Sequence, residues 1–73
     1  MEFIVLVHRA EEGGFWAEVP SLEGCFAQGE TVEEVLLEAQ GAIESHLMAL
    51  AEDGQPIPQE GGVIVATVSA AKA

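Results

Sequence analysis

Short apolar clusters separated by turn residues occupy the first part of the chain. Phe3–Val7 is rich in β-branched residues and predicts a strand that is apolar on both faces. In Phe15–Val19 apolar side chains alternate, so we predict a second strand, which ends at Pro20 because proline has no N–H for a sheet. Cys25–Gln28 predicts a third short strand. This order indicates a small antiparallel meander.

Glycines mark the turns between these segments. Glu11–Gly14 predicts a tight hairpin turn, because Gly13 and Gly14 accept the positive φ angles that such turns need. Gly24 closes the loop before the third predicted strand, and Gly29 ends that strand. We interpret these glycines as structural residues rather than ligand contacts.

The start of a helix is indicated at Thr31. Thr31–Glu34 fits a capping box, in which the Thr31 side chain accepts from the N–H three residues on and the Glu34 carboxylate accepts from the Thr31 N–H. Glu33 and Glu34 also lie at the positive end of the helix dipole, where carboxylates are stabilising. We therefore predict a helix that begins here.

The predicted helix ends at Gly54, which we place as the C-cap, and Pro56 and Pro58 prevent its continuation. At about 100° per residue, its apolar side chains form one stripe about 120° wide, which we expect to cover the sheet. The stripe comprises Val32, Val35, Leu36, Ala39, Ile43, Leu47 and Leu50.

A last apolar run, Val63–Val68, predicts a strand that is apolar on both sides, and we expect Ser69–Ala73 to be frayed. The predicted order is β-β-β-α-β, an α+β fold in which one helix packs on one face of an antiparallel sheet, with residues 1–73 as a single domain. One helix leaves the other face open, whereas strands apolar on both sides need two covered faces. We therefore hypothesise that a second copy or a partner protein covers the face that the helix leaves open. If the helix covers the side chains named below, the side chains that alternate with them form the open face instead. The oligomer face comprises Ile4, Leu6, Trp16, Ile64 and Val68.

The outer side of the predicted helix is a candidate docking surface. Leu37, Gly41 and Met48 fall within about 40° of one another on the helix circumference. An apolar ridge in an acidic frame, with a glycine that admits close approach, suits a protein partner. The alternative is two scattered exposed apolar residues of the kind that monomers tolerate. The flanking carboxylates are those of Glu33, Glu34, Glu44 and Glu52.

Composition restricts the possible partners. The 73 residues include 13 Asp and Glu but only 2 Lys and Arg, so the net charge is −11, and 49% of the residues are hydrophobic. A disordered acidic tail is far less apolar, and two cations are too few to bind nucleic acid or an anionic membrane. The sequence shows no signal peptide or membrane-spanning stretch, which predicts a soluble cytoplasmic protein. We expect a basic protein as partner.

Few residues carry candidate chemistry. Cys25 is the sole cysteine, and we interpret it as a small buried apolar residue rather than a nucleophile. His8 and His46 have no metal-binding spacing, so we predict no metal site and no cofactor. A nuclease of the ribonuclease-H type needs converging carboxylates, but the first predicted strand has none and the sole Asp is Asp53. We therefore predict no catalytic residues and no enzymatic activity.

Four motifs together resemble one known family: Gly13–Pro20, Leu22–Cys25, Gln28–Val35 and Gly54–Pro58. They read Gly-Gly-aromatic in a strand before Pro, then Gly-Cys, then Gly-acidic-Thr-x-x-Glu opening a helix, then Gly-x-Pro-Ile-Pro. This pattern is similar to that of the HicB antitoxins over essentially the whole chain. The motif residues to which we assign structural roles are Gly13, Gly14, Pro20, Gly24, Cys25, Gly29, Thr31 and Pro58.

The resemblance implies a β-β-β-α-β partial ribonuclease-H-like fold and a protein that binds and neutralises a small basic mRNA-cleaving toxin of the HicA family. Many members add a C-terminal DNA-binding domain, but only five residues follow Val68, so we expect no direct DNA binding. Two alternatives stay open. One is an orphan structural or ligand-binding homo-oligomer without a toxin, and the other is a small metal-dependent nuclease on a degenerate ribonuclease-H-like scaffold.

Overall fold

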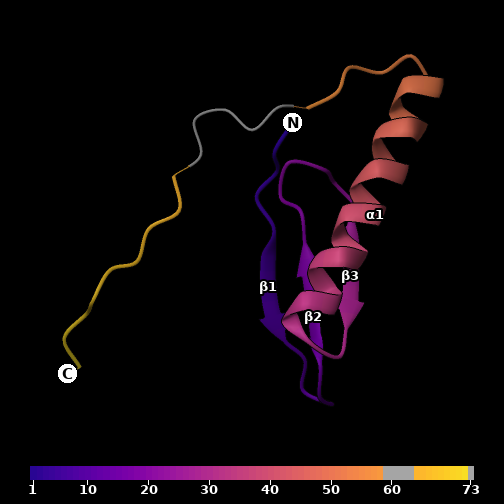
Figure 1. The fold of residues 1–73 in the computed structure, drawn as a ribbon. Coiled ribbons are helices and arrows are strands. Elements are labelled where there is room, and N and C mark those ends of the chain that lie inside the picture. Colours follow the sequence, from indigo (N-terminus) through magenta and orange to yellow (C-terminus); the bar gives the residue numbers. More distant parts are fainter. Residues whose placement is uncertain (59–63, 73) are drawn as a thin grey trace.

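The computed structural model of the protein describes residues 1–58 and 64–72. Within these residues an antiparallel sheet of order β1-β2-β3 packs against one helix (Figure 1). The fold is therefore α+β, and the predicted meander followed by a helix is confirmed. The regular elements are β1 (Leu6–Arg9), β2 (Phe15–Glu18), β3 (Phe26–Gly29) and α1 (Val32–Glu52).

The β1–β2 hairpin closes through the predicted glycine turn. The Ala10 N–H donates to the Gly14 carbonyl at 3.0 Å, and the Gly13 N–H donates to the Ala10 carbonyl at 3.2 Å. Gly14 has φ +76°, and a Cβ placed on it would lie 2.8 Å from the Gly29 carbonyl oxygen. Glycine is therefore required at position 14 both by the backbone conformation and by the close approach of β3.

Strand pairing places β1 later in the chain than predicted. Leu6–Arg9 pairs with Phe15–Glu18, so the first strand begins three residues and ends two residues later than the apolar run from Phe3 to Val7. Phe3 and Val5 still pack against the core. The turn fixes the register of a hairpin, whereas the apolar pattern reports burial, and the two differ here.

The core lies between the sheet and α1. Ala17, which pairs with both Val7 and Ala27, is fully buried, and so are Val35 and Ala39 on the helix. The loop after β2 folds inward and buries Leu22, which forms a buried cluster with Val19 and Cys25. Packed around this cluster are Phe3, Val5, Ala42, Ile43, Leu47 and Leu50.

The predicted helix stripe is only partly covered. Five of its members pack on the sheet or the loop cluster, namely Val35, Ala39, Ile43, Leu47 and Leu50. The other two, Val32 and Leu36, are exposed. The helix packs mainly on β3 and β2, so its side toward β1 has little sheet beneath it. Helical periodicity predicts which side chains share a face, but the position of the helix across the sheet decides how many become buried.

The predicted N-cap of the helix is confirmed, whereas its C-cap lies one residue earlier than predicted. The Thr31 side chain accepts from the Glu34 N–H at 3.1 Å, which confirms Thr31 as the N-cap. The C-cap is Asp53 rather than Gly54, and Gly54 follows it with φ +70°. The Gly54 and Gln55 N–H groups donate to the carbonyls of Ala51 and Leu50, as in a Schellman motif.

The predicted last strand is not formed in the described residues. Val63 lies outside them, while residues 64–72 carry no regular structure, and Ile64 and Val68 are 89% and 91% exposed. Figure 1 shows this segment running in the same direction as β1 but apart from it. A strand needs both a hydrogen-bonding neighbour and faces to bury, and β-propensity alone supplies neither. The prediction of a fourth strand is therefore wrong for this single chain.

Candidate functional site

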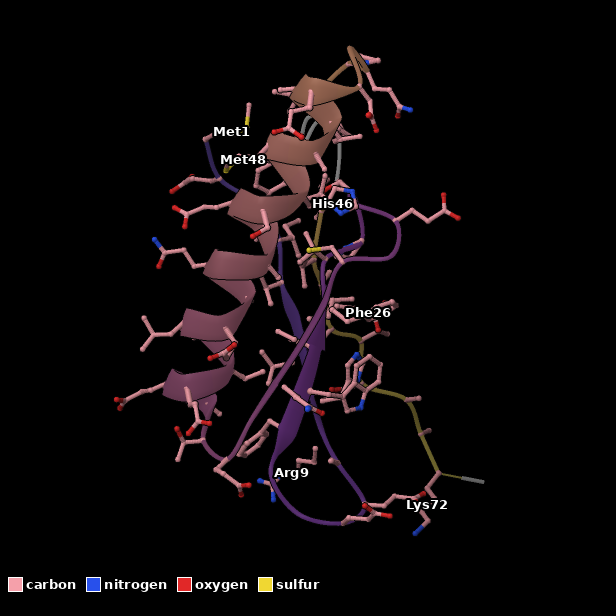
Figure 2. All side chains as sticks on the ribbon, turned by 90° about the vertical axis from the view of Figure 1, so that its right-hand side faces the viewer. Met1, Arg9, Phe26, His46, Met48 and Lys72 are labelled. Carbon is pink, nitrogen blue, oxygen red and sulfur yellow. The ribbon has the colours of Figure 1, made fainter. Side chains whose placement is uncertain are left out.

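The face of the sheet turned away from α1 carries an aromatic cluster. The register places His8 opposite Trp16, and Trp16 opposite Gln28. The His8 and Trp16 rings stack at a centroid distance of 4.3 Å, and the Trp16 and Phe26 rings lie 6.4 Å apart. Trp16 is 37% and Phe26 61% exposed, and Figure 2 shows Phe26 on the side of the sheet away from α1. We call His8, Trp16 and Phe26 the outer aromatic cluster.

A side-chain hydrogen bond borders this cluster. His8 Nε2 lies 2.9 Å from Glu18 Oε2, and both side chains are partly exposed. Among the strand residues on this face, Glu18 is the one carboxylate, and His8 holds it beside the rings. The outer sheet face is thus less acidic than the rest of a molecule with net charge −11.

The predicted oligomer face is brought together only in part. Leu6 and Trp16 share the outer sheet face, and Ile4 lies partly buried in the stretch that leads into β1. Ile64 and Val68 belong to the segment that stands apart from the sheet.

Phe26 was missed as a member of this face. Strict alternation in the third predicted strand, with Cys25 buried, places Phe26 on the opposite side and could have identified it.

The proposed docking ridge lies on the exposed side of α1. Leu37 and Met48 are 70% and 65% exposed, and Gly41 is exposed between them. Leu37 and Met48 are eleven residues apart, so they lie about 16 Å apart along the helix axis and about 20° apart around it. Glu44 falls on the same line, so the ridge has two apolar ends joined by an acidic middle. The remaining residues of the predicted acidic frame, Glu33, Glu34 and Glu52, are exposed as well.

A wide acidic hollow adjoins the Leu37 end of this ridge, near the N-terminus of α1. It has a volume of about 930 Å³ and lies between the hairpin turn, the end of β3 and the first turns of α1. Arg9 is the one cation in its lining, and Phe15 and Trp16 supply part of its floor. A basic side chain entering the hollow would meet several carboxylates at once. These belong to Glu11, Glu12, Glu30, Glu34 and Glu38.

The helix start is fixed against β3 by a close approach. A Cβ placed on Gly29 would lie 2.7 Å from the Val35 backbone nitrogen, so only glycine lets the first helical turn approach this closely. This contact sets the position of Glu33 and Glu34 relative to the sheet. The structural role predicted for Gly29 thus has a direct consequence for the candidate docking surface.

The candidate chemical groups lie in separate places. Cys25 is buried in the core, and burial raises the pKa of its thiol, which keeps it protonated near neutral pH. His8 lies on the outer sheet face and His46 on α1. Among residues 1–58 and 64–72, no group of three or more His, Cys, Asp or Glu side chains is arranged to hold a metal ion. In the same residues, no helix is both long and apolar enough to span a membrane.

Comparison with known proteins places this architecture in a family. The profile of the HicB-like antitoxin of bacterial toxin–antitoxin systems matches residues 3–71. The UPF0150 protein ssr1765 of Synechocystis is 36% identical over 62 residues, which are 85% of this chain and 78% of that protein. The UPF0150 protein Ta0767 of Thermoplasma acidophilum is 33% identical over 60 residues, covering 82% and 87% of the two chains.

A UPF0150 protein of Helicobacter pylori is 35% identical over 65 residues, covering 89% of this chain and 90% of the relative. These three relatives are thus matched over most of their own length as well as most of this chain. The resemblance that the glycine, proline and capping motifs predicted is confirmed, and the chain belongs to the HicB-like antitoxin family.

Proposed function

We propose that this protein is an antitoxin module that binds and neutralises a small basic mRNA-cleaving toxin of the HicA type. Membership of the HicB-like antitoxin family is the observation that carries the proposal. The net charge of −11 supports it, because an anionic surface attracts a basic partner and accelerates encounter. We assign the chain no catalytic role of its own.

We propose the outer side of α1 as the docking surface. The exposed side chains of Leu37 and Met48 supply apolar area to bury, and Gly41 lets a partner backbone approach closely. Glu44 lies between them, Glu33 is exposed one turn before Leu37, and Glu34 lines the acidic hollow beside the ridge. Binding by this mechanism begins with electrostatic steering and is completed by apolar burial, so the partner's RNA-binding surface is covered.

The test is toxin binding by designed helix variants. A HicA-type toxin from the same genome is co-expressed with this protein, growth is followed, and the affinity of the purified pair is measured at 50 and 500 mM NaCl. We expect Leu37→Glu with Met48→Glu to abolish rescue, and high salt to weaken the wild-type complex. The matched control is Ser45→Glu with Ala49→Glu, which adds the same charge to exposed positions elsewhere on α1.

Two results contradict this proposal. Rescue by the ridge variant equal to wild type excludes the ridge as the docking surface. Failure of every HicA-type toxin of that genome to bind excludes the antitoxin function itself. Degradation of RNA by the purified protein alone, dependent on Mg²⁺ or Mn²⁺, would instead support the nuclease alternative.

A second candidate function is that of a self-associating protein without a toxin. The outer aromatic cluster favours it, because Trp16 and Phe26 expose ring surface on a sheet face whose strands carry one carboxylate, that of Glu18. We propose that Leu6, Trp16 and Phe26 meet the same face of a second copy. Trp16→Lys is expected to weaken this association, whereas Gln28→Lys, on the same face, is expected to weaken it less. Sedimentation of the wild type as a monomer at 100 µM would contradict it.

A further inference from the structure

The sheet has an open edge at β1. In the sheet order β1-β2-β3, β1 has β2 on one side and no neighbour on the other. Residues 1–58 and 64–72 contain no strand besides these three. An open edge presents backbone N–H and C=O groups that can pair with an added strand. The four residues of this edge, Leu6 to Arg9, include no carboxylate, although the molecule is strongly anionic.

An apolar groove lies beside this edge. It has a volume of about 360 Å³ and is lined by Phe3 and Val5 from the stretch before β1 and by Leu36, Ile43 and Leu47 from α1. The groove exists because α1 packs mainly over β3 and β2. A strand added beside β1 directs every second side chain toward this side of the sheet, where apolar side chains would fill the groove.

The segment Ile64–Val68 has the chemistry of such a strand. It is rich in β-branched residues, apolar on both sides and without charge. Its large side chains are exposed, from 67% at Val65 to 91% at Val68, and it pairs with no strand of the described chain. The chain thus carries an open strand-binding edge and an unpaired strand-like segment at the same time.

We propose that the β1 edge and its groove bind the Ile64–Val68 segment of a second copy, so that two chains exchange this strand reciprocally. This rests on the self-association proposed above and names its second contact. Within one chain the segment and the edge stand apart (Figure 1), whereas in a two-fold pair each edge receives the segment of the other chain. The β1 strand and the Ile64–Val68 segment carry no carboxylate, and Glu44 is the one carboxylate in the groove lining, so two copies of charge −11 meet where few negative charges face each other.

Charge also favours a parallel orientation. In Figure 1 residues 64–72 run in the direction of β1, and in Figure 2 Lys72 and Arg9 lie at the same end of the molecule. Parallel pairing of Val68 beside Arg9 brings Lys72 to the Glu11–Glu12 turn, where opposite charges attract. Lys72→Glu is therefore expected to weaken the dimer at low salt and to have a smaller effect at high salt.

The first experiment measures mass. Sedimentation equilibrium of the full chain is expected to give twice the 7.7 kDa of one chain. Ile64→Asp with Val68→Asp is expected to raise the dimer dissociation constant about tenfold or more. Its matched control, Ser45→Glu with Ala49→Glu, adds the same charge to exposed positions of α1 outside the groove and keeps the wild-type constant. Far-UV circular dichroism confirms that α1 is intact in both variants, because the segment contributes nothing to the core of the single chain.

The second experiment identifies which chain supplies the strand. Isotopically labelled and unlabelled wild-type chains are unfolded, mixed in equal amounts and refolded, and isotope-filtered NOEs are recorded. We expect intermolecular NOEs from the Ile64 methyl groups to Val5 and Ile43, on the α1 side of the sheet, and from the Val65 methyl groups to Leu6, on the outer face. If these contacts occur only within one chain, the segment binds its own edge and the proposal is wrong. A dimer without these contacts also overturns it and leaves the outer aromatic cluster as the interface. Toxin binding is measured separately, so failure here is distinguishable from failure of the antitoxin function.

Discussion

The two faces of the same three strands have different surroundings. On the face covered by α1, Ala17, Val19 and Cys25 are buried, and the loop residue Leu22 joins them. On the other face Trp16 and Phe26 keep much of their ring surface exposed. One helix is enough to build one core, so a small domain of this kind has apolar area left for binding. The covered face determines stability, and the uncovered surfaces are where partners are expected.

The largest expected effect comes from substituting one side chain on each side of the sheet. Leu22→Ala is expected to reduce the free energy of unfolding by about 2–5 kcal/mol, because it removes a fully buried side chain and leaves a cavity. Phe26→Ala is expected to cost about 1 kcal/mol, mainly the loss of its aromatic contact with Trp16. Urea denaturation measures both losses, at a protein concentration below the dimer dissociation constant so that the monomer is observed. Equal losses would show that the outer face is also part of a core.

Two glycines extend the comparison to α1, since one lies where the helix packs on β3 and the other on its exposed side. Gly29→Ala is expected to destabilise by about 1–3 kcal/mol, because the added Cβ meets the Val35 nitrogen at 2.7 Å. Gly41→Ala meets nothing within 4 Å and is expected to stabilise the helix by about 0.5–1 kcal/mol. Relative to the wild type, the Tm should therefore fall for Gly29→Ala and rise for Gly41→Ala in thermal denaturation. A destabilising Gly41→Ala would contradict the assignment of that position to an open surface.

The helix cap tests how far the covered face depends on local interactions. Thr31→Ala removes the acceptor of the Glu34 N–H and is expected to cost about 1 kcal/mol. Thr31→Ser keeps a hydroxyl and serves as the matched control, with a loss of a few tenths. The helix stays on the sheet in both variants because Val35 and Ala39 remain buried. Amide exchange across α1 would show fraying confined to the first turn, and loss of protection along the whole helix would contradict this.

The parts that the sequence predicted correctly are those set by local chemistry. The glycine turn, the Thr31 cap and the helix follow from backbone preferences within a few residues, and all three are present. The position of β1 and the absence of a strand at 64–68 depend on pairing with distant residues, which apolar pattern does not report. The candidate sites divide in the same way. Exposure of Leu37 and Met48 follows from helical periodicity, whereas the His8–Trp16 stack depends on a register known only from the fold.

The smallest predicted effect concerns the one thiol of the covered face. Burial raises the pKa of Cys25 above its value of 9.0 in an unfolded chain, since the thiolate is poorly solvated in the core. The protonated thiol is therefore favoured by folding: its contribution to stability is complete below about pH 9 and is lost as pH rises through the folded-state pKa. The free energy of unfolding should fall more between pH 7 and pH 10 for the wild type than for Cys25→Ala, as measured by denaturation of each protein at both pH values. His8→Gln, on the outer face, is the control and should keep the wild-type alkaline loss. An identical pH dependence of wild type and Cys25→Ala would mean that the thiolate is solvated in the folded protein, and that the covered face is open to water at this end of the sheet.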